Sequence, residues 1–124
     1  MKDYKEKALR TESYDMDSIK KRLTDEDTIR LLHSAMGLST EANEFLDMLK
    51  KHIYYGKPLD LVNAKEEVSD TFWYCAVAVD VLKTTFEEVM SVNIEKLKAR
   101  YPEKFTKENA INRNLEVERS ILEK

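Results

Sequence analysis

Two pairs of acidic residues are the part of this sequence that could do chemistry. Glu41 and Glu44 stand three residues apart, and so do Glu67 and Asp70. At that spacing both members of a pair lie on one side of a helix. Four carboxylates brought to one place would repel one another unless a divalent cation lay among them. Oxygen-only ligands select hard cations, so we expect Mg²⁺, with Mn²⁺ able to substitute.

Two long helical patterns would position these pairs. Apolar residues recur at helical spacing over 24–52 and again over 60–82. Between the two patterns, Tyr54-Tyr55-Gly56-Lys57-Pro58 predicts a turn. The common centre of the two acidic pairs falls between Tyr55 and Gly56. Antiparallel helices joined there would therefore hold both pairs at one height, about 20 Å from the turn.

The rest of the chain is also helical in pattern, so the predicted class is all-α. The expected fold is a helical bundle of four to five helices, built on a long antiparallel hairpin and completed by dimerisation. We expect one domain over residues 1–124. The other expected elements are a helix over 3–11, an irregular connection over 12–23, a capping box at 24–27, a helix from Thr85 to Tyr101-Pro102 and a last helix over 108–122.

Apolar stripes on the two long helices are the predicted core. On the second helix Asn63, Glu67, Asp70 and Tyr74 fall within an arc of about 40° that flanks the stripe, and this placement argues against an open solvated face. The stripes are Leu31, Ala35, Leu38, Ala42, Phe45 and Leu49 on the first helix, and Leu61, Ala64, Val68, Phe72, Cys75, Val79 and Leu82 on the second.

Composition excludes several functional classes. The 124 residues carry 21 basic and 24 acidic side chains and only two glycines, so no glycine-rich phosphate loop can be formed. The longest apolar run, 72–79, is too short to cross a membrane, and no signal peptide is recognisable. Cys75 is the single cysteine, which favours a reducing cytoplasm. Interspersed charges with a net of −3 argue against nucleic-acid binding.

Two alternatives compete with a Mg²⁺ site. Acidic pairs are common on solvated helix faces, so the protein could be a non-catalytic helical interaction protein or a nucleotide-binding regulatory protein. A di-iron or di-manganese bundle would use Glu-x-x-His motifs. The residues three before His33 and His52 are Arg30 and Leu49, so that motif is absent.

Three segments together resemble the MazG-type nucleotide pyrophosphohydrolases, an all-α superfamily of NTP pyrophosphatases. The similarity covers roughly residues 4–122 and is closest to compact, often phage-encoded members. The segments are Glu41-Ala-Asn-Glu44, Glu67-Val-Ser-Asp70 with the following Thr-Phe-Trp-Tyr74, and Asn93-Ile-Glu-Lys96-Leu-Lys-Ala-Arg100-Tyr-Pro102.

The resemblance implies Mg²⁺-dependent hydrolysis of a nucleoside or deoxynucleoside triphosphate between its α and β phosphates, in nucleotide-pool sanitation or control. It implies that Glu41, Glu44, Glu67 and Asp70 are the metal ligands and the catalytic carboxylates. It also implies a homodimer or homotetramer. Members often carry glycine where this chain has Asn43 and Ser69, so the local helix packing here can differ from theirs. Many also carry a further glutamate where this chain has Thr40, and its absence leaves the number of metal ions open.

Six further residues are candidates for substrate contacts. Asn93, Lys96 and Arg100 share one helix face and match the family's segment, which implies contacts with phosphates; the alternative is that cations simply favour a helix C-terminus. Lys51 could reach a phosphate or sugar, or be an ordinary solvated lysine. Tyr74 could contact base or ribose and His33 the distal base; the alternative for each is a role in packing.

Overall fold

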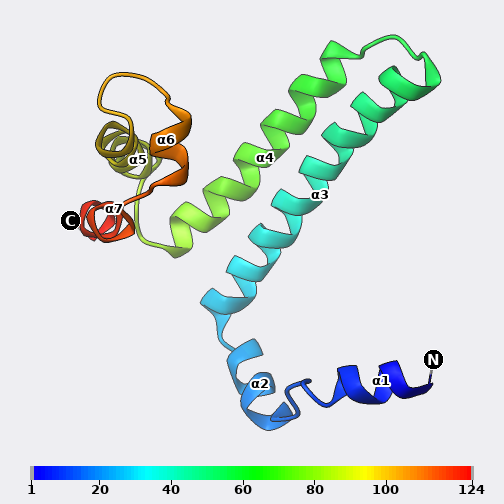
Figure 1. Cartoon of the computed structure of the whole chain (residues 1–124). Coiled ribbons are helices and arrows are strands. Elements are labelled where there is room, and N and C mark those ends of the chain that lie inside the picture. Colours follow the sequence, from blue (N-terminus) through cyan, green and yellow to red (C-terminus); the bar gives the residue numbers. More distant parts are fainter. Residues whose placement is uncertain (1, 124) are drawn as a thin grey trace. The chain divides into compact units, whose positions relative to one another are not determined.

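The structure is a computed structural model that describes residues 2–123, with side chains described from Asp3 onward. This part of the chain contains seven helices and no strand, so the predicted all-α class is confirmed, whereas the expected number of helices was too low (Figure 1). The helices are α1 Lys2–Leu9, α2 Met16–Leu23, α3 Glu26–Tyr55, α4 Leu61–Val81, α5 Phe86–Arg100, α6 Lys107–Ile111 and α7 Leu115–Leu122.

The segment before the first long helix differs from its prediction. Residues 12–23 were expected to be irregular, but most of them form α2, because the Asp15 side chain accepts a hydrogen bond from the Ser18 amide and caps the helix. The capping box predicted at 24–27 is also absent. Asp25 caps α3 instead, accepting from the backbone N–H of Thr28 at 2.8 Å, and Thr24 closes α2.

The last predicted helix is interrupted. The pattern over 108–122 divides into α6 and α7, because the side chain of Asn114 accepts from the Val117 amide and begins a new helix there. The capping box before α5 is present: Thr85 and Glu88 each accept from the other's backbone N–H.

The turn between the two long helices lies where it was predicted. α3 ends at Gly56, whose φ of 67° and ψ of 18° place it in the left-handed region that glycine adopts without steric cost. Pro58 follows, and α4 begins at Leu61. The side chain of Asp60 accepts from the backbone N–H groups of Val62 and Asn63 and so stabilises the start of α4.

α3 and the part of α4 up to Val77 lie side by side and run in opposite directions (Figure 1). The hydroxyl of Ser34 donates to the carbonyl of Tyr74 at 2.8 Å, while further along α3 the carboxylate of Glu41 approaches that of Glu67. The close crossing depends on Gly37, because a Cβ atom there would overlap the ring of Tyr74.

The predicted apolar core was partly wrong. The buried residues of α3 are Ser34, Gly37 and Met48. The predicted core residues Phe45 and Phe72 are exposed, the latter by 53%. The reason is that the flank of small and polar residues, not the apolar stripe, lies between the two helices. Part of each apolar stripe is thereby left at the surface.

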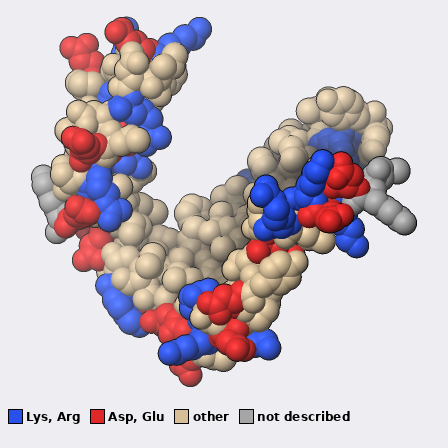
Figure 2. Space-filling model, turned by 60° about the horizontal axis from the view of Figure 1, so that its bottom comes forward, with Lys and Arg blue, Asp and Glu red and all other residues tan. Residues whose placement is uncertain are grey.

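The chain divides into two compact units, one up to Val77 and one from Ala78. In the second unit α5 packs against α7. Basic and acidic side chains are interspersed over the face shown in Figure 2. Among the helices of the described residues, none is both long enough and apolar enough to cross a membrane.

Candidate active site

Three of the four predicted carboxylates converge between α3 and α4. Glu41, Glu67 and Asp70 each offer an oxygen atom, and these atoms lie within 4.8 Å of one another. Glu67 is buried, Glu41 is half-buried and Asp70 is exposed. Each comes from one face of its helix, and the antiparallel crossing brings the two faces together. The donor set contains only carboxylate oxygens, which fits a hard divalent cation such as Mg²⁺ or Mn²⁺.

Glu44 lies beside this cluster rather than within it. It is exposed, one turn of α3 beyond Glu41, and lines the neighbouring cleft together with Glu67. The structure therefore brings together three members of the predicted quartet and leaves the fourth on the cleft wall. Its carboxylate is close enough to Glu41 to contribute to the electrostatic repulsion described below.

The pKa of the Glu41 carboxyl is raised by its position in this cluster of carboxylates. Desolvation raises the pKa of Glu41, and repulsion from Glu44, Asp70 and Glu67 adds to the rise. A hydrogen bond from the hydroxyl of Thr40, 3.3 Å away, opposes it. Such a cluster of like charges favours the approach of a cation.

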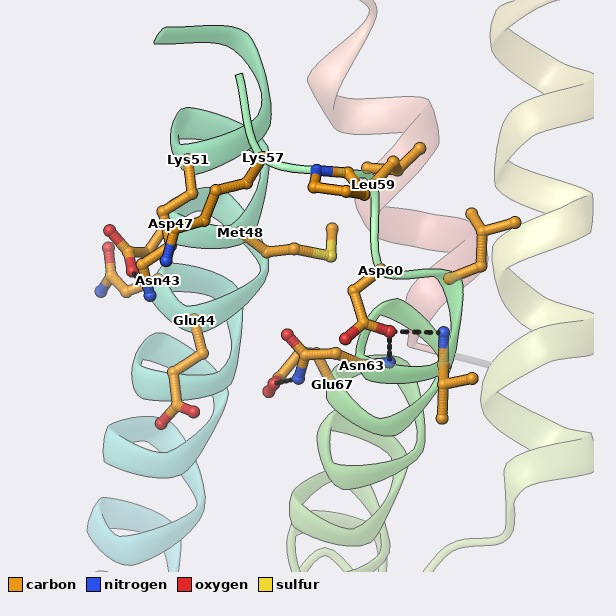
Figure 3. Close-up of a pocket in the computed structure, with 13 residues that line it drawn as sticks. Asn43, Glu44, Asp47, Met48, Lys51, Lys57, Leu59, Asp60, Asn63 and Glu67 are labelled. Atoms are coloured by element: carbon orange, nitrogen blue, oxygen red, sulfur yellow. Dashed lines mark hydrogen bonds and ion pairs between the residues drawn. The ribbon is translucent and has the colours of Figure 1, made fainter. Parts of the chain in front are cut away.

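An open cleft of about 980 Å³ adjoins the carboxylates and extends to the turn between α3 and α4 (Figure 3). One end is acidic, with Glu44 and Glu67 on facing helices. The other end combines apolar and basic side chains with the carboxylates of Asp47 and Asp60. The lining residues there include Met48, Lys51, Lys57, Leu59 and Val62.

Lys51, a predicted substrate contact, lines the cleft and forms an ion pair with Asp47. Its ammonium lies 2.6 Å from Asp47 Oδ2, and Lys50 pairs with the other carboxylate oxygen. Hydrogen bonds from Lys50 and Lys51 lower the pKa of Asp47 to about 2. The Lys51 side chain is 48% exposed, and its contact with substrate stays a prediction.

The predicted contacts His33 and Tyr74 meet in an aromatic cluster with Trp73. The ring centroids of Tyr74 lie 5.7 Å from His33 and 4.9 Å from Trp73, in edge-to-face arrangements. Tyr74 also covers Gly37 on α3, one turn from the carboxylates. Its ring therefore has a packing role at the helix crossing, and a role in substrate binding stays a prediction.

The three predicted phosphate contacts on α5 belong to the second unit. Asn93 is exposed and Lys96 is half-buried. Arg100 pairs with Glu118: its Nε donates to Glu118 at 2.8 Å and a terminal nitrogen donates to the other carboxylate oxygen, and its contact with phosphate stays a prediction. Arg113 shares the same carboxylate at 2.6 Å. Hydrogen bonds from Arg100 and Arg113 lower the pKa of Glu118 to about 2.

Comparison with known protein families decides the assignment. The family model described as the MazG nucleotide pyrophosphohydrolase domain matches residues 31–105, which is more than half of the chain. This chain belongs to the MazG family. Neither the curated proteins nor the solved structures gave a match. The matched MazG segment includes both acidic pairs and all of α5, whereas α6 and α7 lie outside it.

Three residues of this MazG domain, Asn63, Lys57 and Leu59, lie around the carboxylates or the cleft without having been predicted as site residues. Asn63 stands one turn before Glu67, a spacing at which helical side chains meet, and its amide donates to the Glu67 carboxylate. That spacing was a usable signal. Lys57 and Leu59 reach the cleft from the turn, where no periodicity indicates direction, so the sequence offered no signal for them.

Proposed function

We propose that this protein is a Mg²⁺-dependent nucleoside triphosphate pyrophosphohydrolase that converts (d)NTP to (d)NMP and pyrophosphate. The observation that carries the proposal is the convergence of Glu41, Glu67 and Asp70 from two helices beside an open cleft, in a chain of the MazG family. A role in nucleotide-pool sanitation or control follows from this chemistry, because the reaction removes a triphosphate from the pool.

In this proposal the carboxylates would bind the metal ion and the side chains of the cleft would bind the substrate. Glu41, Glu67 and Asp70 would hold the divalent cation, and Glu44 on the cleft wall would orient the attacking water. When bound, the cation would neutralise charge on the phosphate oxygens and make water a stronger nucleophile near neutral pH. Lys51 would contact a phosphate, since its side chain lines the cleft and is partly exposed.

A second copy of the chain would complete the fold as a homodimer or homotetramer. The support is the apolar surface of the two long helices, where Met36 is 60% exposed, Leu46 is 62% exposed and Trp73 is 56% exposed. Burial of such side chains stabilises association. Size-exclusion chromatography with light scattering should give a multiple of the 14.6 kDa chain mass, whereas a monomer would contradict this part of the proposal.

The activity is tested with a panel of NTPs and dNTPs in Mg²⁺, assaying pyrophosphate and orthophosphate separately. Pyrophosphate that disappears with EDTA supports the proposal. Glu67→Gln should abolish release, because it removes a negative ligand with little change in shape. Glu66→Gln is the matched control: Glu66 is the neighbouring acid and is exposed, outside the cluster. Orthophosphate as the product would contradict cleavage between the α and β phosphates.

A further inference from the structure

The carboxylate of Glu67 is held by a neutral donor from its own helix. Glu67 is only 5% exposed, and the side-chain amide of Asn63 donates a hydrogen bond to its Oε1 atom (Figure 3). A buried carboxylate without a hydrogen-bond partner is costly. The bond therefore has an energetic reason to persist, and it selects one orientation of the Glu67 side chain.

Asn63 is itself fixed by the start of α4. The carboxylate of Asp60 accepts from the backbone N–H of Asn63 at 3.0 Å and from that of Val62 at 3.1 Å. These bonds define the first turn, on which the Asn63 side chain stands. Asn63 is half-buried, so its side chain has restricted freedom. A continuous series of bonds thus runs from the helix start through Asn63 to Glu67.

The chemistry of the donor matters. A lysine at this position would neutralise Glu67 and compete with a cation, and an aspartate would repel it. An amide orients the carboxylate while leaving its negative charge intact. Because Asn63 occupies Oε1, the second oxygen of Glu67 remains for another ligand. Groups that orient metal ligands in this way commonly account for 10–100-fold in metal affinity or activity.

We propose that Asn63 is a positioning residue that orients Glu67 for binding a divalent cation. The inference rests on the proposed function, in which Glu67 is a ligand of that cation. It predicts that loss of the Asn63 amide weakens metal binding without removing the chemistry. The residue acts through Glu67, so high metal concentration should compensate for its loss.

The test measures Mn²⁺ binding to the nucleotide-free protein by EPR, together with the Mg²⁺ dependence of pyrophosphate release. Asn63→Ala should raise the dissociation constant for Mn²⁺ and the half-saturating Mg²⁺ concentration about tenfold or more. At saturating Mg²⁺, kcat should return to near the wild-type value. Asn63→Leu, which keeps the branched side-chain shape and removes the donor, serves if the alanine variant fails to fold.

Asn43→Ala is the matched control. Asn43 also lines the cleft, and its amide also donates to a residue four positions earlier, but the acceptor is the backbone carbonyl of Ser39. The Mn²⁺ dissociation constant of this variant should stay within about twofold of wild type. A purely structural role of Asn63 would lower the melting temperature and leave the Mn²⁺ dissociation constant unchanged.

The outcomes separate the two proposals. If the wild type binds Mn²⁺ and both Asn63 variants bind it with the same dissociation constant, the positioning role is overturned and the proposed function is left intact. A wild-type protein that binds no Mn²⁺ and releases no pyrophosphate would overturn both. Weaker binding in the Asn63 variants, with the Asn43 control unaffected, supports the role of Asn63.

Discussion

The contact between Gly37 and Tyr74 predicts an unusual response to a conservative change. In Gly37→Ala the new methyl carbon would stand closer than 3.0 Å to Cδ1, Cε1 and Cζ of the Tyr74 ring, inside the limit that real Cβ atoms respect. The ring cannot easily turn away, because Trp73 and His33 pack edge-to-face against it. The helices must separate or the ring must leave its place.

The magnitude follows from two opposed terms. Overpacking typically costs about 1–3 kcal/mol, and three overlapped ring atoms argue for the upper end. Replacing glycine by alanine within a helix contributes about 1 kcal/mol of stability. Gly37→Ala should therefore lower the free energy of unfolding by about 2 kcal/mol net. In a Tyr74→Ala background the overlap is gone, so the same change should raise it by about 1 kcal/mol.

A double-mutant cycle measures this reversal. Urea denaturation of the four proteins at one protein concentration, followed by far-UV circular dichroism, should give an interaction energy of about 3 kcal/mol. Fluorescence of Trp73, the single tryptophan, gives an independent signal beside the crossing. If Gly37→Ala has the same effect in both backgrounds within about 0.5 kcal/mol, the proposed overlap is refuted.

Three further predictions concern pH, ligand linkage and the cleft. The pKa of Glu118 is lowered from 4.5 to about 2, so its ion pairs stabilise the fold above pH 4.5 and are lost as pH falls toward 2. The difference in melting temperature between wild type and Glu118→Gln should therefore shrink as pH falls from 4.5 to 2. A difference that stays constant over this range would contradict the role of these ion pairs. Mg²⁺ with a non-hydrolysable nucleotide at 100 times its dissociation constant should stabilise the wild type by about 2.7 kcal/mol in thermal unfolding, and Asp70→Asn should lose this effect. Lys51→Ala should raise KM for the nucleotide about tenfold in steady-state assays, as expected for loss of one charge-assisted hydrogen bond. Lys50 is the neighbouring lysine and does not line the cleft, so Lys50→Ala should leave KM unchanged.

Residue spacing predicted the parts of the site that depend on helical geometry alone. Glu41, Glu67 and Asp70 meet because each helix repeats every 3.6 residues and the turn at Gly56 fixes the register between them. The arc through Asn63, Glu67, Asp70 and Tyr74 was predicted not to be an open solvated face, and all of these residues except the exposed Asp70 are buried or half-buried. Such features can be predicted without knowing how the other helices pack.

Features that depend on competing contacts could not be predicted in the same way. Apolar periodicity predicted Phe45 and Phe72 as core, but periodicity marks an apolar face without showing whether the same chain covers it. The pairing of Arg100 with Glu118, eighteen residues away in the sequence, was not predicted, and the contact of Arg100 with phosphate stays a prediction. Such a partner can be identified only when α7 is placed against α5.

We propose that the carboxylates of α3 and α4 support cleavage between the α and β phosphates. Phosphorus NMR of one preferred nucleoside triphosphate, incubated with Mg²⁺ and either wild type or Glu67→Gln, tests this most directly. We expect wild type to yield the monophosphate and pyrophosphate together and Glu67→Gln to yield neither. A nucleoside diphosphate with orthophosphate, or pyrophosphate formed equally by both proteins, would contradict it.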